Sequence, residues 1–198
     1  MNIEKTLSVQ KREGGGKGPS GRLRAEKLIP GVFYTASGEN ISVQAPVLPL
    51  EKIYGEMGHT TVFNLEIEDN GKKTLHPVLI WQVQFHPYKR AFTHIDFYGV
   101  DLDKEVTVDV PVEFVGTSRG VKLGGRLETY REMVRLCSKP LTMPQKITVD
   151  VTDMGINDTV TVSDLKLPEN VRAVFDQNYA LVSVISKSKD EEAEGEKA

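Results

Sequence analysis

Cysteine is nearly absent from this sequence of 198 residues, in which Cys137 is the only one. A single thiol excludes a disulfide within the chain, and it excludes a cluster of thiolates around zinc or iron–sulfur. Because Cys137 lies in the apolar, strand-like segment VRLCS, we interpret it as a small buried side chain.

Long hydrophobic runs are also missing. No apolar segment approaches the roughly 20 residues that span a bilayer, and the start MNIEKTLSVQKR lacks the apolar core of a signal peptide. With 39% hydrophobic and 27% charged residues, the composition is that of an ordinary globular protein of one domain or two small ones. We therefore expect a cytoplasmic protein without a membrane partner.

The net charge of -3 conceals an asymmetry along the chain. Residues 1–95 hold 12 Lys and Arg against 9 Asp and Glu, whereas residues 96–198 hold 13 against 19. The basic excess is densest in the first 27 residues, which hold seven cations and three Glu. A basic N-terminal part indicates a polyanionic partner, and an acidic C-terminal part does not.

Glycines and cations gather in KREGGGKGPSGRLRAEKLIP, residues 11–30, where Gly16-x-Gly18-x-x-Gly21 matches a dinucleotide-binding fingerprint. That fold needs a buried apolar strand before the glycines and a crossover helix after them. Polar residues precede the motif here, Pro19 interrupts it, and no Gly-Lys-Ser/Thr of a phosphate loop follows. We expect no nucleotide cofactor and no small-molecule substrate. Glycines that let a backbone approach phosphates, beside lysine and arginine, favour a large polyanion over the alternative of a merely solvated loop.

A short helix is predicted inside this segment, from Arg22 to Ile29, with Ser20 as its N-cap and Pro30 as its end. Arg22 and Arg24 project about 200° apart on such a helix. A helix inserted end-on into a widened RNA groove brings both arginines to phosphates, with its positive N-terminus toward the RNA.

The rest of the chain alternates in the manner of strands. Before residue 100, a helix opened by Pro49 joins predicted strands at residues 3–10, 32–34, 41–44, 60–67, 73–86 and 91–100, with a hairpin turn at Asn70-Gly71. After it, strands are predicted at residues 105–116, 130–137, 146–153, 159–164 and 179–186.

We therefore predict a mainly β protein of two domains, residues 1–100 and 101–186, followed by an acidic, disordered tail at residues 187–198. The first domain contains short helices and the second is all-β. Pro111 inside the first strand of the second domain predicts an edge position for that strand.

A second polar set ends the first domain. Gln82, Gln84 and His86 share one face of their predicted strand, and His94 and Asp96 share a face of the next. One interpretation makes His94 a catalytic base oriented by Asp96, or makes both residues metal ligands. The sequence offers no nucleophile and no third ligand nearby. Plain surface polarity is another interpretation. Amide, imidazole and carboxylate groups also read base edges and 2′-hydroxyls of folded RNA. Trp81 and Phe85, on the opposite face, are expected in the core.

Four separated segments resemble those of a known protein family: KREGGGKGPSGRLRAEKLIPGVFY, HPVLIWQVQFHPYKRAFTHIDFYGV, GVKLGGRLETYREMVRLC and VTVSDLKLPENV. Together they resemble the large-subunit ribosomal protein family that binds 5S ribosomal RNA, in its longer two-domain form, the general stress protein CTC family. The resemblance implies an N-terminal β-barrel-like domain that binds 5S rRNA, a C-terminal β domain, and a place on the central protuberance of the bacterial large subunit beside neighbouring ribosomal proteins.

The resemblance also implies the RNA-contacting positions, which are Lys11, Lys17, Ser20, Arg22, Arg24, Tyr34, Gln84, His94 and Asp96. Arg12 is added from its charge alone. Two residues depart from the family, because Gly21 stands where members usually carry arginine and Trp81 replaces a usually polar residue. One phosphate or groove contact is therefore in question.

The favoured interpretation is a non-catalytic structural protein of the ribosome, without cofactor or metal. The alternative is a protein-interaction module whose β-rich second half recruits a partner. In the second half, Arg119, Lys122 and Arg126 flank the glycines of SRGVKLGGRLE. We interpret this segment as a polar hairpin loop rather than a contact with RNA or a neighbouring protein. An enzyme is the third choice, since no nucleophile, acid pair or metal spacing holds together.

Overall fold

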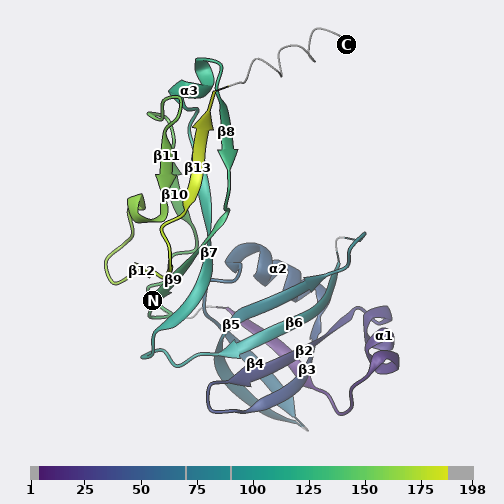
Figure 1. Ribbon diagram of the computed structural model, residues 1–198. Coiled ribbons are helices and arrows are strands. Elements are labelled where there is room, and N and C mark those ends of the chain that lie inside the picture. The colour runs from purple at the N-terminus through teal and green to yellow at the C-terminus, as the bar shows by residue number, and fades with distance from the viewer. Residues whose placement is uncertain (1–4, 70, 90, 187–198) are drawn as a thin grey trace, which may run out of the picture. The chain divides into compact units, whose positions relative to one another are not determined.

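The structure is a computed structural model that describes residues 5–69, 71–89 and 91–186 (Figure 1). Strands dominate the described chain and its helices are short, which confirms the predicted mainly β fold class. The expected disordered tail at residues 187–198 lies outside the described residues.

The chain folds into two compact units. One takes in the described residues up to Val108 together with Cys137–Gln145, and the other takes in Asp109–Leu136 and the described residues from Lys146 onward. The predicted boundary near Val100 therefore falls close to the end of the longest segment of the first unit.

Six strands of the first unit close into a barrel in the order β1-β3-β2-β6-β5-β4. β1 pairs in parallel with β4, and β2 pairs in parallel with β6, while the other neighbours are antiparallel. Closure removes the exposed edges of the sheet. The strands are β1 (Thr6–Lys11), β2 (Leu28–Thr35), β3 (Asn40–Pro46), β4 (Phe63–Asp69), β5 (Lys72–Phe85) and β6 (Phe92–Gly99).

The barrel interior is filled by apolar side chains that alternate along each strand. Phe33, Phe63 and Phe97 are completely buried there, and Phe63 and Phe97 pack edge to face at 6.2 Å between ring centroids. The helix α2 (Val47–Met57) contributes Leu50 and Ile53 to the same core. The sequence therefore predicted this helix correctly, although it begins two residues before Pro49.

Two hairpins connect strands of the barrel, and the second is the one predicted at Asn70-Gly71. β2 and β3 pair with Tyr34 opposite Asn40, and β4 and β5 pair with Asp69 opposite Lys72. Gly71 adopts a φ of 83° in the second turn, a conformation that glycine tolerates without strain. Its neighbour Asn70 lies outside the described residues.

The first helix differs from its prediction. α1 runs from Lys17 to Ala25, not from Arg22 to Ile29, and Gly16 with a φ of 108° is its N-cap. Ser20 therefore lies within the helix and caps nothing. Lys27, with a φ of 60°, reverses the chain after the helix.

Leu28 and Ile29 begin β2 instead of ending α1, because Ile29 is 1% exposed and belongs to the barrel core. Pro30 consequently lies inside a strand. It pairs with Gln44 of β3, whereas the pairing of β2 with β6 starts only at Gly31. The missing N–H of Pro30 therefore leaves no gap in the β2–β6 ladder.

β5 contains one extra residue. Ile80 lies opposite Phe97 and Gln82 lies opposite Asp96, so two residues of β5 match one of β6 and Trp81 is the bulge. The prediction of a core position was wrong for Trp81, which is 47% exposed because the extra residue breaks the alternation that would place it on the same side as the inward-facing Val83. Phe85 was also misplaced, since it is 51% exposed, although its ring contacts Phe92 at 4.9 Å.

The second unit contains two small sheets, although the first residues of β7 and the last residues of β9 belong to the first unit. One has the order β10-β7-β9-β12 and the other has the order β11-β13-β8. Their strands are β7 (Val106–Val115), β8 (Arg126–Thr129), β9 (Met133–Ser138), β10 (Ile147–Asp150), β11 (Thr159–Thr161), β12 (Arg172–Ala173) and β13 (Ala180–Ile185). Two single-turn helices join them, α3 (Arg119–Lys122) and the 3₁₀ helix η1 (Val162–Asp164).

β7 is an inner strand of its sheet, so the edge position predicted from Pro111 was wrong. The pairing explains how the proline is tolerated. Val112 donates its N–H to Glu132 on the β9 side, and successive amides of a strand point to opposite sides. Pro111 thus faces the β10 side, where pairing begins only at Val112 with Ile147.

The segment SRGVKLGGRLE was interpreted as a hairpin loop, but it forms α3 and β8. Two of its glycines serve packing, since a Cβ on Gly120 would lie 2.7 Å from both Gly155 and Val184, and one on Gly125 would lie 2.8 Å from Gly120. Arg119 pairs with Asp153 at 2.7 Å. Cys137 is 9% exposed and forms no disulfide, which confirms its interpretation as a buried side chain.

Candidate nucleic-acid interface

The outer face of β2, β6 and β5 gathers polar side chains from three strands. Gln82 and Gln84 of β5 lie opposite Asp96 and His94 of β6, and residues directly opposite in a sheet point to the same side. The predicted polar sets from the two strands therefore share one face. Together with the neighbouring tyrosines they form what we call the strand face: Tyr34, Gln82, Gln84, His94, Asp96 and Tyr98.

His94 and Asp96 stand side by side within the strand face. His94 Nδ1 lies 2.9 Å from Asp96 Oδ1, and the two side chains are 26% and 23% exposed. Asp96 Oδ1 nevertheless lacks a hydrogen-bond partner among the described residues. Because this oxygen is buried and lies against His94 Nδ1, a ligand can reach only the other atoms of the Asp96 carboxylate.

Two tyrosines extend the strand face toward β2. Tyr34 lies beside Tyr98 in the β2–β6 register, with 5.7 Å between ring centroids. Burial, and then the charge of Asp96, raises the pKa of Tyr34. The hydroxyl therefore stays protonated at neutral pH and can donate a hydrogen bond. Tyr98 was not among the predicted site residues, although its position two residues after Asp96 on the same strand indicates the same face.

His86 does not join this face, contrary to the prediction from alternation. Its Nδ1 accepts hydrogen bonds from the backbone N–H groups of Tyr88 and Lys89, at 3.2 Å each. The ring therefore stabilises the turn after β5, which is the reason that it leaves the row of Gln82 and Gln84.

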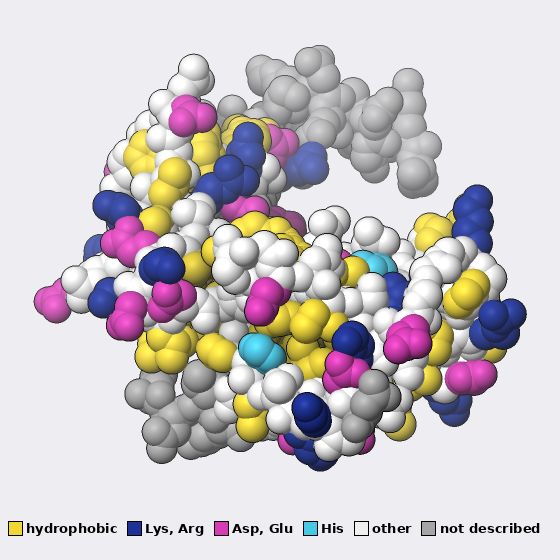
Figure 2. Space-filling view, turned by 90° about the horizontal axis from the view of Figure 1, so that it is seen from below, with side chains coloured by type: hydrophobic (Ala, Val, Ile, Leu, Met, Phe, Trp, Pro, Cys, Tyr) yellow, Lys and Arg dark blue, Asp and Glu magenta, His cyan; other side chains and the backbone are white. Residues whose placement is uncertain are grey.

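α1 projects from the barrel and buries none of its side chains. Lys17 and Arg22 on this helix are exposed, and their side chains form no hydrogen bond or ion pair with the residues that the structure describes. Ser20 is half-buried in the same helix. Figure 2 shows dark blue Lys and Arg side chains at the right-hand edge, the side on which Figure 1 places α1. The exposed cations favour an anionic ligand.

Arg24 connects α1 to the strand face. Its Nε and Nη2 both donate to the backbone oxygen of Thr93 on β6, at 3.1 and 2.9 Å. Thr93 immediately precedes His94, so the helix is anchored next to the polar row. The prediction that Arg24 contacts RNA stays a prediction, whereas its hydrogen bonds to Thr93 hold the helix against β6.

Lys11 and Arg12 lie at the end of β1. Lys11 Nζ pairs with Asp69 Oδ2 at 2.6 Å, and this hydrogen bond raises the pKa of Lys11. Arg12 is joined to β3 by its backbone N–H, which donates to Ser42. The Nε and Nη1 of Arg12 are buried and have no hydrogen-bond partner among the described residues. Arg12 is thus a positioned cation whose charge is not neutralised.

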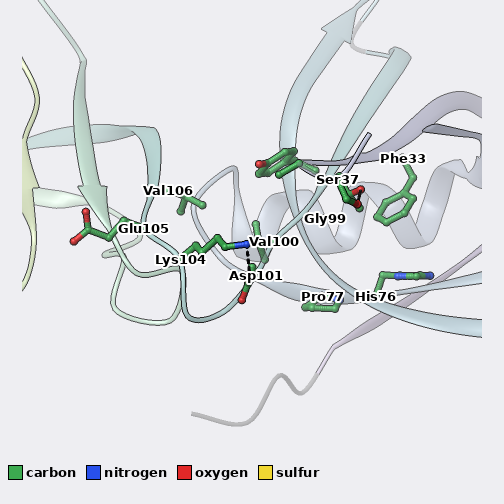
Figure 3. A pocket seen from close by; sticks show the side chains of 13 residues that line it. Phe33, Ser37, His76, Pro77, Gly99, Val100, Asp101, Lys104, Glu105 and Val106 are labelled. Carbon is green, nitrogen blue, oxygen red and sulfur yellow. Dashed lines mark hydrogen bonds and ion pairs between the residues drawn. The ribbon is translucent and has the colours of Figure 1, made fainter. Parts of the chain in front are cut away.

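The first unit also contains a pocket of about 320 Å³ between β2, β5, β6 and the segment that leads into β7 (Figure 3). Phe33 and His76 line one part of it, with 4.9 Å between their rings. Three charged residues line it: Asp101 and Lys104, which pair with each other at 3.0 Å, and Glu105, whose carboxylate accepts a hydrogen bond from the thiol of Cys137 at 3.5 Å. The pocket therefore presents no convergent charges to a substrate.

The described part of the chain contains neither a cluster of metal ligands nor a membrane-spanning helix. Within residues 5–69, 71–89 and 91–186, no three side chains of His, Cys, Asp or Glu come together as metal ligands would. In the same part of the chain, none of the helices has the length and apolar character needed to cross a membrane.

Comparison with known proteins gives two family matches. Residues 7–97 match the Ribosomal L25p family, and residues 105–188 match the family described as ribosomal protein TL5, C-terminal domain. Three curated relatives are each named large ribosomal subunit protein bL25. That of Desulfovibrio desulfuricans is 88% identical and covers 99% of both chains. That of Nitratidesulfovibrio vulgaris is 58% identical over 94% of this chain and 98% of its own. That of Syntrophobacter fumaroxidans is 36% identical over 94% of this chain and 93% of its own.

The matched ranges correspond to the barrel and to the β-rich second half, in the order that the family resemblance implied. The chain therefore belongs to the Ribosomal L25p family, the bL25 structural proteins of the large ribosomal subunit, and carries a TL5-type C-terminal domain.

Proposed function

We propose that this protein binds 5S rRNA in the central protuberance of the large ribosomal subunit, through α1 and the strand face together. One observation carries the proposal: Arg24 fixes the cationic helix beside His94 and Asp96. Phosphate contacts position a protein on nucleic acid, and base contacts specify the sequence. Here the cations of α1, which suit phosphates, adjoin the polar groups of the strand face, which suit bases.

The helix supplies the positioning contacts. A nine-residue helix is marginal by itself in water, and α1 buries nothing that would stabilise it. Its cations Lys17 and Arg22 pair with phosphates of the RNA, and this contact also orders the helix. Arg12 adds a third cation, and Lys11 adds one that Asp69 partly neutralises. Ser20 supplies a hydroxyl on the same helix.

The strand face supplies the recognition contacts. Gln84 presents an amide, His94 an imidazole, Asp96 an acceptor and Tyr34 a hydroxyl, which suit base edges and 2′-hydroxyls of folded RNA. The contacts proposed for RNA are thus Lys11, Arg12, Lys17, Ser20, Arg22, Arg24, Tyr34, Gln84, His94 and Asp96. All of them lie in residues 1–100, which we propose as the RNA-binding domain.

The second unit suits a protein partner better than RNA. A groove of about 580 Å³ there combines the exposed apolar side chains of Met133 (54%), Val174 (43%) and Phe175 (38%) with charged residues of both signs, namely Asp109, Asp176, Arg131 and Arg135. Exposed apolar groups that lie together indicate a protein contact. We place a neighbouring large-subunit ribosomal protein on this groove.

Titration of labelled 5S rRNA with the full chain, in excess transfer RNA as non-specific competitor, tests the proposal. The expected result is a saturable complex that transfer RNA does not displace. Complete displacement by transfer RNA would contradict recognition of 5S rRNA and leave a general affinity for polyanions.

A further inference from the structure

The bulge in β5 places a large aromatic side chain at the border of the strand face. Trp81 is 47% exposed, and its ring lies 5.2 Å from that of Tyr98, with 49° between the planes. Tyr98 in turn lies 5.7 Å from Tyr34. Three aromatic rings therefore form a row across β5, β6 and β2.

The barrel core does not need this side chain. Ile80 and Val83, on either side of the bulge, pack into the core, whereas Trp81 contacts the outer ring of Tyr98. A half-exposed indole leaves much apolar surface in water, at a cost of roughly 25 cal/mol for each Å² of apolar area. A ligand that covers the ring would remove that cost.

The charges around the ring decide which part of an RNA could cover it. The strand face contains the carboxylate of Asp96 and no Lys or Arg. Phosphates are repelled by this carboxylate, so the sugar–phosphate chain should follow α1 and leave bases toward the strand face. An exposed aromatic ring binds the flat face of a base by stacking, whatever the base is.

We infer that Trp81 stacks on an unpaired nucleobase of the RNA bound by α1 and the strand face, with Tyr98 supporting the indole from the other side. The inference rests on the proposed RNA-binding function. It assigns to the bulge a base-binding site in addition to the hydrogen-bonding groups of Gln82 and Asp96.

Trp81 is the only tryptophan of the chain, so its fluorescence reports on this site alone. Excitation at a wavelength that tyrosine does not absorb, during titration of the full chain with a 5S rRNA transcript, should show quenching that saturates with complex formation. Complex formation is followed in parallel by filter binding. Stacked bases quench indole, whereas phosphates bound at α1 leave it unchanged.

Variants separate stacking from charge. Trp81→Ala should weaken binding of the transcript about tenfold, and Trp81→Phe should restore most of the affinity, because a phenyl ring also stacks. Neither variant should change the slope of log affinity against log salt, since no ion pair is lost. Leu75→Ala is the matched control, because Leu75 is 59% exposed on the same strand and lies opposite Glu66 of β4.

The outcomes distinguish this inference from the proposed function. Wild-type binding without quenching, or with unchanged affinity of Trp81→Ala, overturns the stacking site and leaves RNA binding intact. Quenching by a large-subunit protein but not by 5S rRNA also overturns it, and makes Trp81 part of a protein contact. If the wild-type chain does not bind 5S rRNA, both are wrong.

Discussion

Gln82 of β5 lies directly opposite Asp96 of β6, although Ile80, two positions earlier, lies opposite Phe97. The single extra residue between these pairs changes which side chains face outward. With strict alternation from the buried Ile80, Gln82 would point into the barrel. The bulge at Trp81 turns it outward instead, and Gln84 with it, beside Asp96 and His94.

His94 and Asp96 are expected to carry sequence recognition. His94→Ala or Asp96→Ala should weaken binding to 5S rRNA by about 1–3 kcal/mol, the scale of one specific base contact, because each removes a hydrogen-bonding group of the strand face. Affinity for transfer RNA should hardly change. Competition filter binding measures both, and equal losses on the two RNAs would reduce the pair to a structural role.

Arg24 is expected to order α1 as well as to bind RNA. Arg24→Lys keeps the charge but loses the two parallel hydrogen bonds to Thr93. Loss of about 1 kcal/mol should raise local opening roughly fivefold. Hydrogen exchange of the α1 amides should become faster while the thermal unfolding of the barrel stays the same. Unchanged exchange in α1 would show that the Thr93 contact does not hold the helix.

Residues 1–100 are expected to fold alone and to bind 5S rRNA. The barrel closes between Thr6 and Gly99, and the proposed RNA contacts all lie within it or on α1. The fragment should match the full chain within about threefold in affinity, a difference of roughly 0.7 kcal/mol. A fragment that is folded by circular dichroism but does not bind 5S rRNA would assign an essential contact to residues 101–186.

The hydrogen bonds to Glu66 predict that the stability of the barrel depends on pH. Hydrogen bonds from Lys73 and then Ser8 lower its pKa below the ordinary value. Because the carboxyl group of Glu66 has a lower pKa in the folded state than in the unfolded state, it stabilises the fold at pH values above its unfolded-state pKa. This stabilisation is lost as the pH falls through the folded-state pKa. The Tm of the wild type should therefore fall further on acidification than that of Glu66→Gln. Parallel Tm curves for the two proteins would show that Glu66 does not stabilise the barrel.

Much of the fold could be predicted from alternation, because barrel and sheet strands bury every second side chain. Long strands such as β5 and β7 were found in this way. The four-residue β8 and two-residue β12 were not, since such short segments show no period. The start of β2 was assigned to α1 because Leu28 and Ile29 suit either element, and only pairing with β3 decides between them.

The candidate site shows the same limits. Alternation found Gln84, His94 and Asp96, and could also have found Tyr98. It could not find the bulge, which depends on tertiary pairing, and so it placed Trp81 in the core. The family membership confirms the prediction of a ribosomal structural protein that is not an enzyme and is ribosome-bound in the cytoplasm.

The salt dependence of 5S rRNA binding tests the role of α1 most directly. Lys17 and Arg22 have no partner among the described residues, so each should bind a phosphate and release counterions. Arg24 is left unchanged because it anchors the helix. Lys122→Ala with Lys166→Ala is the matched control, because both lysines are exposed in the second unit.

The measurement is the slope of log affinity against log salt for the full chain, for Lys17→Ala with Arg22→Ala, and for the control. The double variant should flatten the slope by about 1.5–2 units, and the control should leave it at the wild-type value. If the Lys17→Ala, Arg22→Ala variant keeps the wild-type slope on 5S rRNA, α1 does not bind the phosphates and the proposed interface is wrong.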